Sequence, residues 1–185
     1  MSTTGRAFVA VVPPPEVLDA IGAAVGPLRE RMGQVRWAPR KQWHITLQFL
    51  GNHVDLDATA RALGEGLDAA AGPARLGSAG AIPSERRGRL LWIGVEQGTE
   101  LLAQLASAVA DIMRPLGVEP DRDRFHAHLT VARMKRPADL SAPVAALRAA
   151  HIGPEWPMNE IVLVRSLTKP TGAEYETIAR VALSG

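Results

Sequence analysis

Two short stretches of this chain share one pattern of polar and apolar positions. In each, a histidine, an apolar residue, a threonine and a second apolar residue lie within a run that predicts a buried strand: His44–Leu47 and His128–Val131. Because successive side chains of a strand point to opposite faces, we expect each histidine to share a face with its threonine. The apolar residues then pack into the core. A chain with only five histidines carries this arrangement twice, which indicates a paired site.

Apolar positions at helical spacing predict four helices, and apolar runs bounded by turn residues predict strands. The helices are expected over about 15–32, 56–67, 99–116 and 140–147. The strands are expected over about 6–12, 35–37, 43–50, 75–82, 90–95, 125–132, 160–165 and 175–183. Helices interleaved with hairpins indicate a mixed α and β fold rather than a strict βαβ series. No linker separates the halves, so we expect residues 1–185 to form a single domain of two similar lobes facing a cleft.

The composition excludes some kinds of chemistry. The absence of cysteine excludes disulfides, zinc–thiolate sites and cysteine nucleophiles. No apolar run has the length of a membrane span or of a signal region, so we expect a soluble, cytoplasmic protein. A net charge of +2 is too small to indicate nucleic acid by itself. Arginine greatly outnumbers lysine, which suits bidentate phosphate contacts, but a composition rich in alanine and glycine explains the bias equally.

Two histidines that face each other fit one class of reaction. An imidazole with a pKa of about 6.5 is either a neutral base or a charged acid near neutral pH. In-line displacement at phosphorus needs both forms, one to deprotonate water and one to protonate the leaving oxygen. Threonine hydroxyls donate hydrogen bonds to the non-bridging phosphate oxygens, where charge must be stabilised. Such a scheme needs no metal and no cofactor.

The two motifs and their flanks resemble the two-histidine (2H) phosphoesterase superfamily, and within it the RNA 2′,3′-cyclic phosphodiesterases, also called 2′-5′ RNA ligases. The likeness covers nearly the whole chain. It is carried by the stretches Arg6–Val11, Trp43–Gly51, Pro83–Val95, Phe125–Arg133 and Leu163–Leu183. Ala127 departs from the family pattern, which usually has proline before the second histidine.

The resemblance implies an α+β fold of two lobes, with two antiparallel sheets lining a central cleft and helices packed outside. It implies metal-independent hydrolysis of a 2′,3′-cyclic phosphate on RNA or a nucleoside to a 2′-phosphate, together with reversible 2′-5′ ligation. His44 and His128 are then the acid and base, and we assign His44 as the acid and His128 as the base. Thr46 and Thr130 bind phosphate, and Arg133 joins them.

Arg133 lies five residues after His128, so a regular strand places it on the opposite face, whereas a strand ending near Ala132 lets it turn toward phosphate. His126 shares a face with His128 and is either a metal ligand or a residue at the cleft rim. No third ligand or zinc motif supports a metal, so we expect none. His53 and His151 are expected at the surface.

The remaining polar and aromatic residues leave alternatives open. Trp43 and Phe49 either stack a base or belong to the core, where Trp37, Trp92 and Trp156 are also expected. Eight basic residues near the motif strands are either solvated or form a rim that binds RNA phosphates: Arg36, Arg40, Lys41, Arg86, Arg87, Arg89, Arg122 and Arg124. The alternative functions are a phosphodiesterase for another small cyclic or 2′-5′-linked nucleotide and a non-catalytic nucleotide-binding module. We expect a monomer, because one chain supplies both motifs.

Overall fold

The computed structural model describes residues 3–33, 35–120, 125–170 and 172–185. Its helices are α1 (Pro15–Arg31), α2 (Leu56–Gly66), α3 (Thr99–Met113) and α4 (Ser141–Ala149), with short 3₁₀ helices η1 (Arg40–Gln42), η2 (Glu85–Arg87) and η3 (Arg114–Leu116). Its strands are β1 (Thr4–Val11), β2 (Arg36–Trp37), β3 (Ile45–Asp55), β4 (Gly72–Ile82), β5 (Gly88–Gln97), β6 (His128–Ala138), β7 (Trp156–Met158), β8 (Glu160–Lys169) and β9 (Gly172–Ala182).

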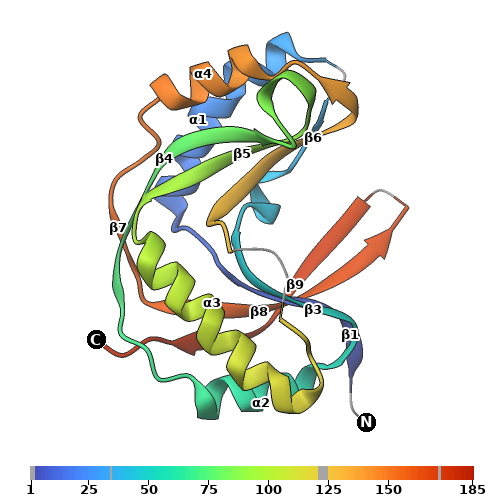
Figure 1. The fold of residues 1–185 in the computed structure, drawn as a ribbon, viewed down its shortest axis with the longest axis vertical. Coiled ribbons are helices and arrows are strands. Elements are labelled where there is room, and N and C mark those ends of the chain that lie inside the picture. The colour runs from blue at the N-terminus through green and yellow to red at the C-terminus, as the bar shows by residue number, and fades with distance from the viewer. Residues whose placement is uncertain (1–2, 34, 121–124, 171) are drawn as a thin grey trace.

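The strands form one curved antiparallel sheet in the order β7-β4-β5-β6-β3-β1-β8-β9, with β2 paired to β6 (Figure 1). Strand pairing is shortest at the middle of the sheet, between β3 and β6. Among the described residues, these two strands share one register pair, Ile45 with Leu129. This junction divides the sheet into a β4-β5-β6 half and a β3-β1-β8-β9 half. The expected α+β fold with two antiparallel sheets lining a cleft is confirmed, and the junction joins the two sheets edge to edge.

Apart from β2 and the short 3₁₀ helices, an order of strand, helix, strand and helix occurs twice along the chain, as β1-α1-β3-α2 and as β5-α3-β6-α4. In each of these two series the first helix packs with the second helix of the other series (Figure 1). Thus α1 lies beside α4 on the β4-β5-β6 half, and α3 lies with α2 against the other half. Each helix turns an apolar stripe to the sheet; in α1 the stripe is Val17, Ile21, Val25 and Leu28. No helix in the described ranges is long and apolar enough to span a membrane.

The expected elements are all present, with shifts at their ends. β3 continues past Gly51 to Asp55 because β1 pairs with it on both sides of this residue. Gly51 itself has a φ of +109°, which an L side chain would disfavour. The side chain of Asp55 then caps α2 by accepting from the backbone N–H groups of Asp57 and Ala58. β7 was not expected, since it has only three residues and one of them is a proline.

Candidate active site

The junction of the sheet brings the two His-x-Thr motifs together. Ile45 and Leu129 are fully buried and directly opposite each other. His44 and Thr46 flank Ile45, and His128 and Thr130 flank Leu129, so this pair brings the two motifs near each other. All four polar side chains line one cavity of about 190 Å³. The two-residue period of a strand places each histidine on the same face as its threonine. The junction of the sheet then turns both His–Thr pairs toward the same cavity.

Both imidazoles are oriented by the same kind of hydrogen bond. Nδ1 of His44 lies 2.7 Å from the carbonyl oxygen of Gln42, and Nδ1 of His128 lies 2.7 Å from that of His126. A carbonyl only accepts, so Nδ1 carries the hydrogen and donates in both rings. Nε2 is therefore the basic nitrogen of each neutral ring. In His44 it lies 3.0 Å from Oγ1 of Thr46, which donates to it.

Burial keeps both histidines neutral in the unliganded protein. It lowers the pKa of His44 from 6.5 to about 4; the bond to Gln42 opposes the shift, and repulsion from Arg133, and from His128 when that ring is protonated, adds to it. Burial also lowers the pKa of His128, with His126 and Arg133 adding to the shift. At pH 7 neither ring carries its second proton, so neither can act as an acid until a bound anion raises its pKa.

Arg133 reaches the cavity through a bulge in β6. Trp92 of β5 pairs with Thr130 of β6, and the next residue of β5, Leu91, pairs with Ala132. Val131 therefore has no partner on β5 and is the extra residue of a β-bulge. The bulge reverses the alternation, and both Val131 and Ala132 are buried. Arg133 therefore lines the cavity with His128 and Thr130. The sequence left two possibilities, a regular strand or one ending near Ala132. Instead, the strand continues to Ala138, and the alternation of its side chains shifts by one residue at the bulge.

A matching bulge in β3 places Phe49. Ala10 of β1 pairs with Thr46 of β3, and the next residue of β1, Val9, pairs with Gln48. Leu47 therefore has no partner on β1 and is the extra residue. Phe49, five residues after His44, thereby lines the cavity as Arg133 does five residues after His128. The two halves of the site thus differ at this equivalent position: one presents an aromatic ring, the other a guanidinium.

Aromatic rings surround His44. Phe8 stacks on its imidazole with ring centroids 4.6 Å apart, and Tyr175 meets it edge-on at 5.5 Å. The guanidinium of Arg6 lies 5.0 Å from the centre of the Phe49 ring. Phe49 was expected either to stack a base or to belong to the core, whereas Arg6, Phe8 and Tyr175 were not expected as site residues. The alternation of Arg6 and Phe8 in the first strand puts them on one face, but only the pairing of β1 with β3 shows that this face lines the cavity.

The other candidates divide between site, core and surface. Trp43 is 4 % exposed and belongs to the core, whereas Trp92, expected in the core, lies half-buried with its ring edge-on to His126 and His128. His126 is exposed at the rim. His53 and His151 are exposed, as expected. No group of three potential metal ligands occurs among the residues described.

The eight basic residues of the expected rim do not stay together as one set. Arg40 is paired with Asp19, and Lys41 lies 4.0 Å from Glu174. Arg122 and Arg124 lie outside the described residues. The others, Arg36, Arg86, Arg87 and Arg89, are exposed.

A curved antiparallel sheet with a His-x-Thr motif on each side of its junction is the architecture of the two-histidine phosphoesterases. A profile of the 2′-5′ RNA ligase superfamily matches residues 13–170. The chain is 34 % identical to the RNA 2′,3′-cyclic phosphodiesterase of Thermus thermophilus over 97 % of its length and 91 % of the relative's. It is 31 % identical to that of Archaeoglobus fulgidus, covering 94 % of this chain and 97 % of the relative.

Solved structures share the fold. A crystal structure of a Thermus thermophilus protein superposes with a TM-score of 0.79 at 29 % identity, covering 97 % of this chain and 98 % of that one. Escherichia coli LigT, crystallised with 3′-AMP, superposes with a TM-score of 0.75 at 20 % identity over 99 % of this chain and all of its own (100 %). The chain belongs to the 2′-5′ RNA ligase superfamily.

Proposed function

We propose that this protein is an RNA 2′,3′-cyclic phosphodiesterase that opens the cyclic phosphate to a 2′-phosphate without a metal. The observation that carries the proposal is one cavity lined by the hydroxyls of Thr46 and Thr130 and by two imidazoles whose Nδ1 atoms donate to backbone carbonyls. Relatives of this chain over nearly its whole length are named RNA 2′,3′-cyclic phosphodiesterase, which supports the substrate class.

In the proposed reaction, Nε2 of His128 takes a proton from water, and the water oxygen attacks phosphorus. The bond from phosphorus to the 3′ oxygen breaks, and that oxygen takes a proton from Nε2 of His44. The hydroxyls of Thr46 and Thr130 donate to the non-bridging oxygens, and Arg133 offsets their charge. A 5′-hydroxyl in place of water gives a 2′-5′ linkage by the same steps, which is the ligation expected of the family.

Phe8, Phe49 and Tyr175 supply a place for the base of the terminal nucleoside. Phe49 and Tyr175 are half-buried and line the cavity beside His44. A flat aromatic side chain stacks any base, so this part of the site favours a nucleoside without selecting its sequence. Under this proposal the protein acts as a monomer, because one chain supplies every group named. We also propose that it acts in the cytoplasm.

The direct test is incubation with 2′,3′-cyclic AMP and with an RNA ending in a 2′,3′-cyclic phosphate, both in excess EDTA. We expect hydrolysis of both substrates and a 2′-phosphate product, identified by chromatography against the 2′ and 3′ isomers. A 3′-phosphate product would reverse the leaving group. Hydrolysis of another small cyclic nucleotide alone would favour the alternative phosphodiesterase, and binding without turnover would favour the nucleotide-binding module.

Binding of an anion to the site is expected to take up about one proton at pH 7. His44 is neutral in the free protein because burial lowers its pKa to about 4, and as the acid it must be protonated in the complex. A phosphate anion beside Nε2 favours the imidazolium and raises that pKa. Calorimetry of 2′-AMP binding in buffers of different ionisation enthalpy measures the uptake.

The histidine that takes up this proton identifies the acid. We expect His44→Gln to abolish the uptake while His128→Gln retains it. The opposite pattern would exchange the two roles and leave the pairing intact.

A further inference from the structure

Strand β5 places the indole of Trp92 beside the second motif. Trp92 is the register partner of Thr130, and Gly94 is the register partner of His128. Directly opposite residues of an antiparallel pair lie on the same face of the sheet, so Trp92 lies on the face that holds the two polar side chains of the motif. Gly94 has no side chain, which leaves the space next to His128 open to the indole.

Two glycines seat the indole of Trp92. Gly80 of β4 is its register partner, and a Cβ at Gly80 would lie 2.3 Å from its Cζ2 atom. A Cβ at Gly94 would lie 2.9 Å from its Cζ3 atom. Both distances are below the about 3.5–4.0 Å at which carbon atoms pack, so a side chain at either position would displace the ring. The indole therefore occupies a place that only glycine leaves free.

The seated indole meets the imidazoles of the second motif edge-on. Its ring centroid lies 4.8 Å from that of His126 and 6.2 Å from that of His128, with interplanar angles of 79° and 64°. Aromatic rings favour such edge-to-face contacts. The hydrogen bond from Nδ1 of His128 to the carbonyl oxygen of His126 holds one edge of the imidazole, and the indole limits its tilt from the side of β5. Two strands thus restrain this ring.

The first motif lacks an equivalent of this contact. Ala10 of β1 lies opposite Thr46, as Trp92 of β5 lies opposite Thr130. A methyl group is too small to hold a neighbouring ring as the indole does. His44 instead takes its aromatic contacts from another position of β1 and from β9. The indole is therefore a feature of the half of the site with the second motif.

We propose that Trp92 is the positioning residue of His128: its indole, seated over Gly80 and Gly94, fixes the imidazole with Nε2 toward the cavity and keeps water from its β5 side. Among the described residues that line the cavity, His128 and Thr130 are present and Trp92 is not, so Trp92 acts through His128 and not on the substrate. This inference rests on the proposed function, in which His128 is the base, and adds a residue that the reaction needs without contact to the reacting atoms.

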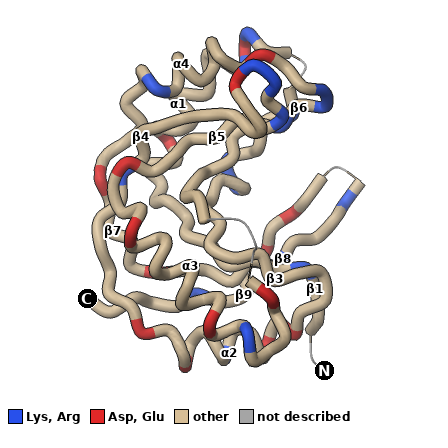
Figure 2. The backbone as a smooth tube through the Cα atoms, viewed as in Figure 1, with Lys and Arg blue, Asp and Glu red and all other residues tan. Residues whose placement is uncertain are grey.

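The indole also contributes to the burial of His128. Burial is the main cause that lowers the pKa of His128 below 6.5, so removal of the indole is expected to admit water and raise this pKa. β5 brings no charge to this point. Its charged residues are Arg89 and Glu96, near its two ends, and Figure 2 shows the strand between them in tan.

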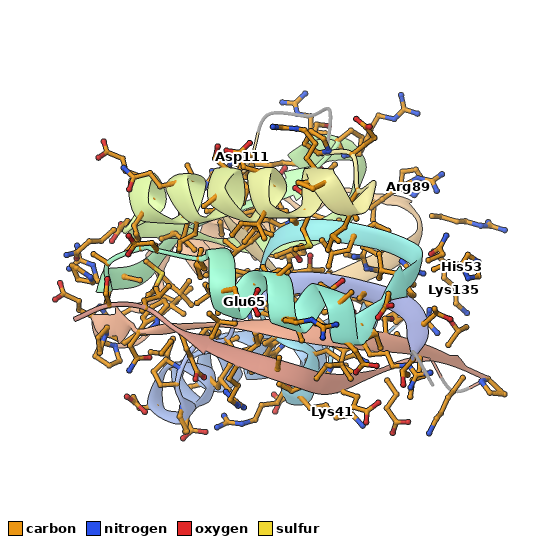
Figure 3. All side chains as sticks on the ribbon, turned by 90° about the horizontal axis from the view of Figure 1, so that it is seen from below. Lys41, His53, Glu65, Arg89, Asp111 and Lys135 are labelled. Atoms are coloured by element: carbon orange, nitrogen blue, oxygen red, sulfur yellow. The ribbon has the colours of Figure 1, made fainter. Side chains whose placement is uncertain are left out.

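The charged and titratable groups that face His128 come from other elements of the described chain. Those that share its cavity are Arg6 of β1, His44 before β3, Arg133 of β6 and Tyr175 of β9. Those in a second groove that His128 also lines are His126, Arg114 of η3 and Asp111 of α3, which Figure 3 labels. Substitution of Trp92 removes none of them, so a change in the pKa of His128 reports on the lost cover.

The kinetic test replaces Trp92 by alanine and by phenylalanine, with Trp37→Ala as the matched control. Trp37 is half-buried like Trp92 and packs against the core. For Trp92→Ala we expect kcat on 2′,3′-cyclic AMP to fall about 10- to 100-fold with KM within about twofold, because a misplaced base slows the reaction of a substrate that still binds. Trp92→Phe keeps an aromatic ring and loses an Nε1–H that finds no acceptor in the described structure, so it is expected to rescue kcat. The control is expected to keep both constants.

Titration of the free protein, followed by NMR, measures the same contact without a substrate. The Cε1–H resonance of His128 is assigned by its absence from the spectrum of His128→Gln. In Trp92→Ala we expect the pKa of His128 to rise toward 6.5, whereas Trp92→Phe and Trp37→Ala titrate as the unmodified protein does. A general loss of structure would instead move every histidine alike.

An unchanged kcat or an unchanged pKa of His128 in folded Trp92→Ala would overturn the proposal, and so would equal effects in Trp92→Phe or Trp37→Ala. If the unmodified protein hydrolyses neither cyclic AMP nor an RNA with a cyclic phosphate end, the proposed function fails, and the titration decides the position of His128 separately. A rise of its pKa in Trp92→Ala alone then supports the contact, and equal titration in all variants overturns it.

Gly80→Ala decides the question if Trp92→Ala does not fold. The added methyl group displaces the indole, so we expect the His128 resonance to shift and kcat to fall. Gly64→Ala is the control, since its methyl group meets no atom of another element within 4 Å. Gly64 lies on α2 next to Glu65, which is labelled in Figure 3. Equal behaviour of these two variants would contradict the proposed seat.

Discussion

Replacement of His44 or of His128 by alanine is expected to lower kcat/KM for 2′,3′-cyclic AMP by about 10²- to 10⁴-fold, the usual contribution of a positioned general acid or base. The two rings are anchored alike at Nδ1, so each variant removes one Nε2 and leaves the other in place. Since acid and base act in one step, the double variant is expected to be little worse than either single variant.

The pH dependence of kcat/KM sharpens this prediction. The base works above its pKa and the acid below its own, so the unmodified protein gives a bell whose maximum lies between the two pKa values. Burial lowers both, which places the maximum below pH 6.5. Each alanine variant is expected to lose one limb of the bell. His53→Ala, at an exposed position, is the control and should keep both the rate and the bell. Full activity in His128→Ala would refute the pairing.

Leu129→Ala is expected to destabilise the fold by about 2–5 kcal/mol, the range for a fully buried leucine truncated in a core. Leu129 is 0 % exposed and forms the one described register pair between β3 and β6, opposite Ile45. A cavity here removes contacts between both halves of the sheet at once, directly behind His128 and Thr130. Urea unfolding followed by circular dichroism measures the change in the free energy of unfolding.

Leu116→Ala provides the matched control, because it makes the same chemical change at a side chain that is 45 % exposed. A change within about 0.5 kcal/mol is expected there. A cost below about 1 kcal/mol for Leu129→Ala would mean that the junction repacks around the missing atoms, and the sheet halves would then not depend on this contact.

The helices were predictable because their signals are local. Apolar residues at helical spacing, such as Val17, Ile21 and Val25 in α1, mark a buried stripe whatever it packs against, and Pro15 marks the start. The strands were predictable as apolar runs, but their ends depend on partners outside the run. Thus β3 extends beyond Gly51 because β1 pairs with it there, and nothing in the run itself shows this.

The basic residues near the motif strands show the same limit. Arg36, Arg40 and Lys41 are close in sequence and were grouped for that reason. In the fold, Arg40 lies beside Asp19 and Lys41 beside Glu174. Arg36 instead lies opposite Arg133. Ion pairs form between elements that only the fold brings together. Sequence therefore showed how many cations lie near the motifs, and the tertiary contacts showed which of them keep their charge available.

By itself, the sequence determined that His44 shares a face with Thr46 and His128 with Thr130, because the period of a strand is two residues wherever it lies. Tertiary structure decided the rest of the site. A bulge depends on the register with a neighbouring strand, so only the pairing of β5 with β6 turns Arg133 into the cavity, and only that of β1 with β3 does the same for Phe49. Burial, which no local pattern measures, then lowers the pKa of both histidines.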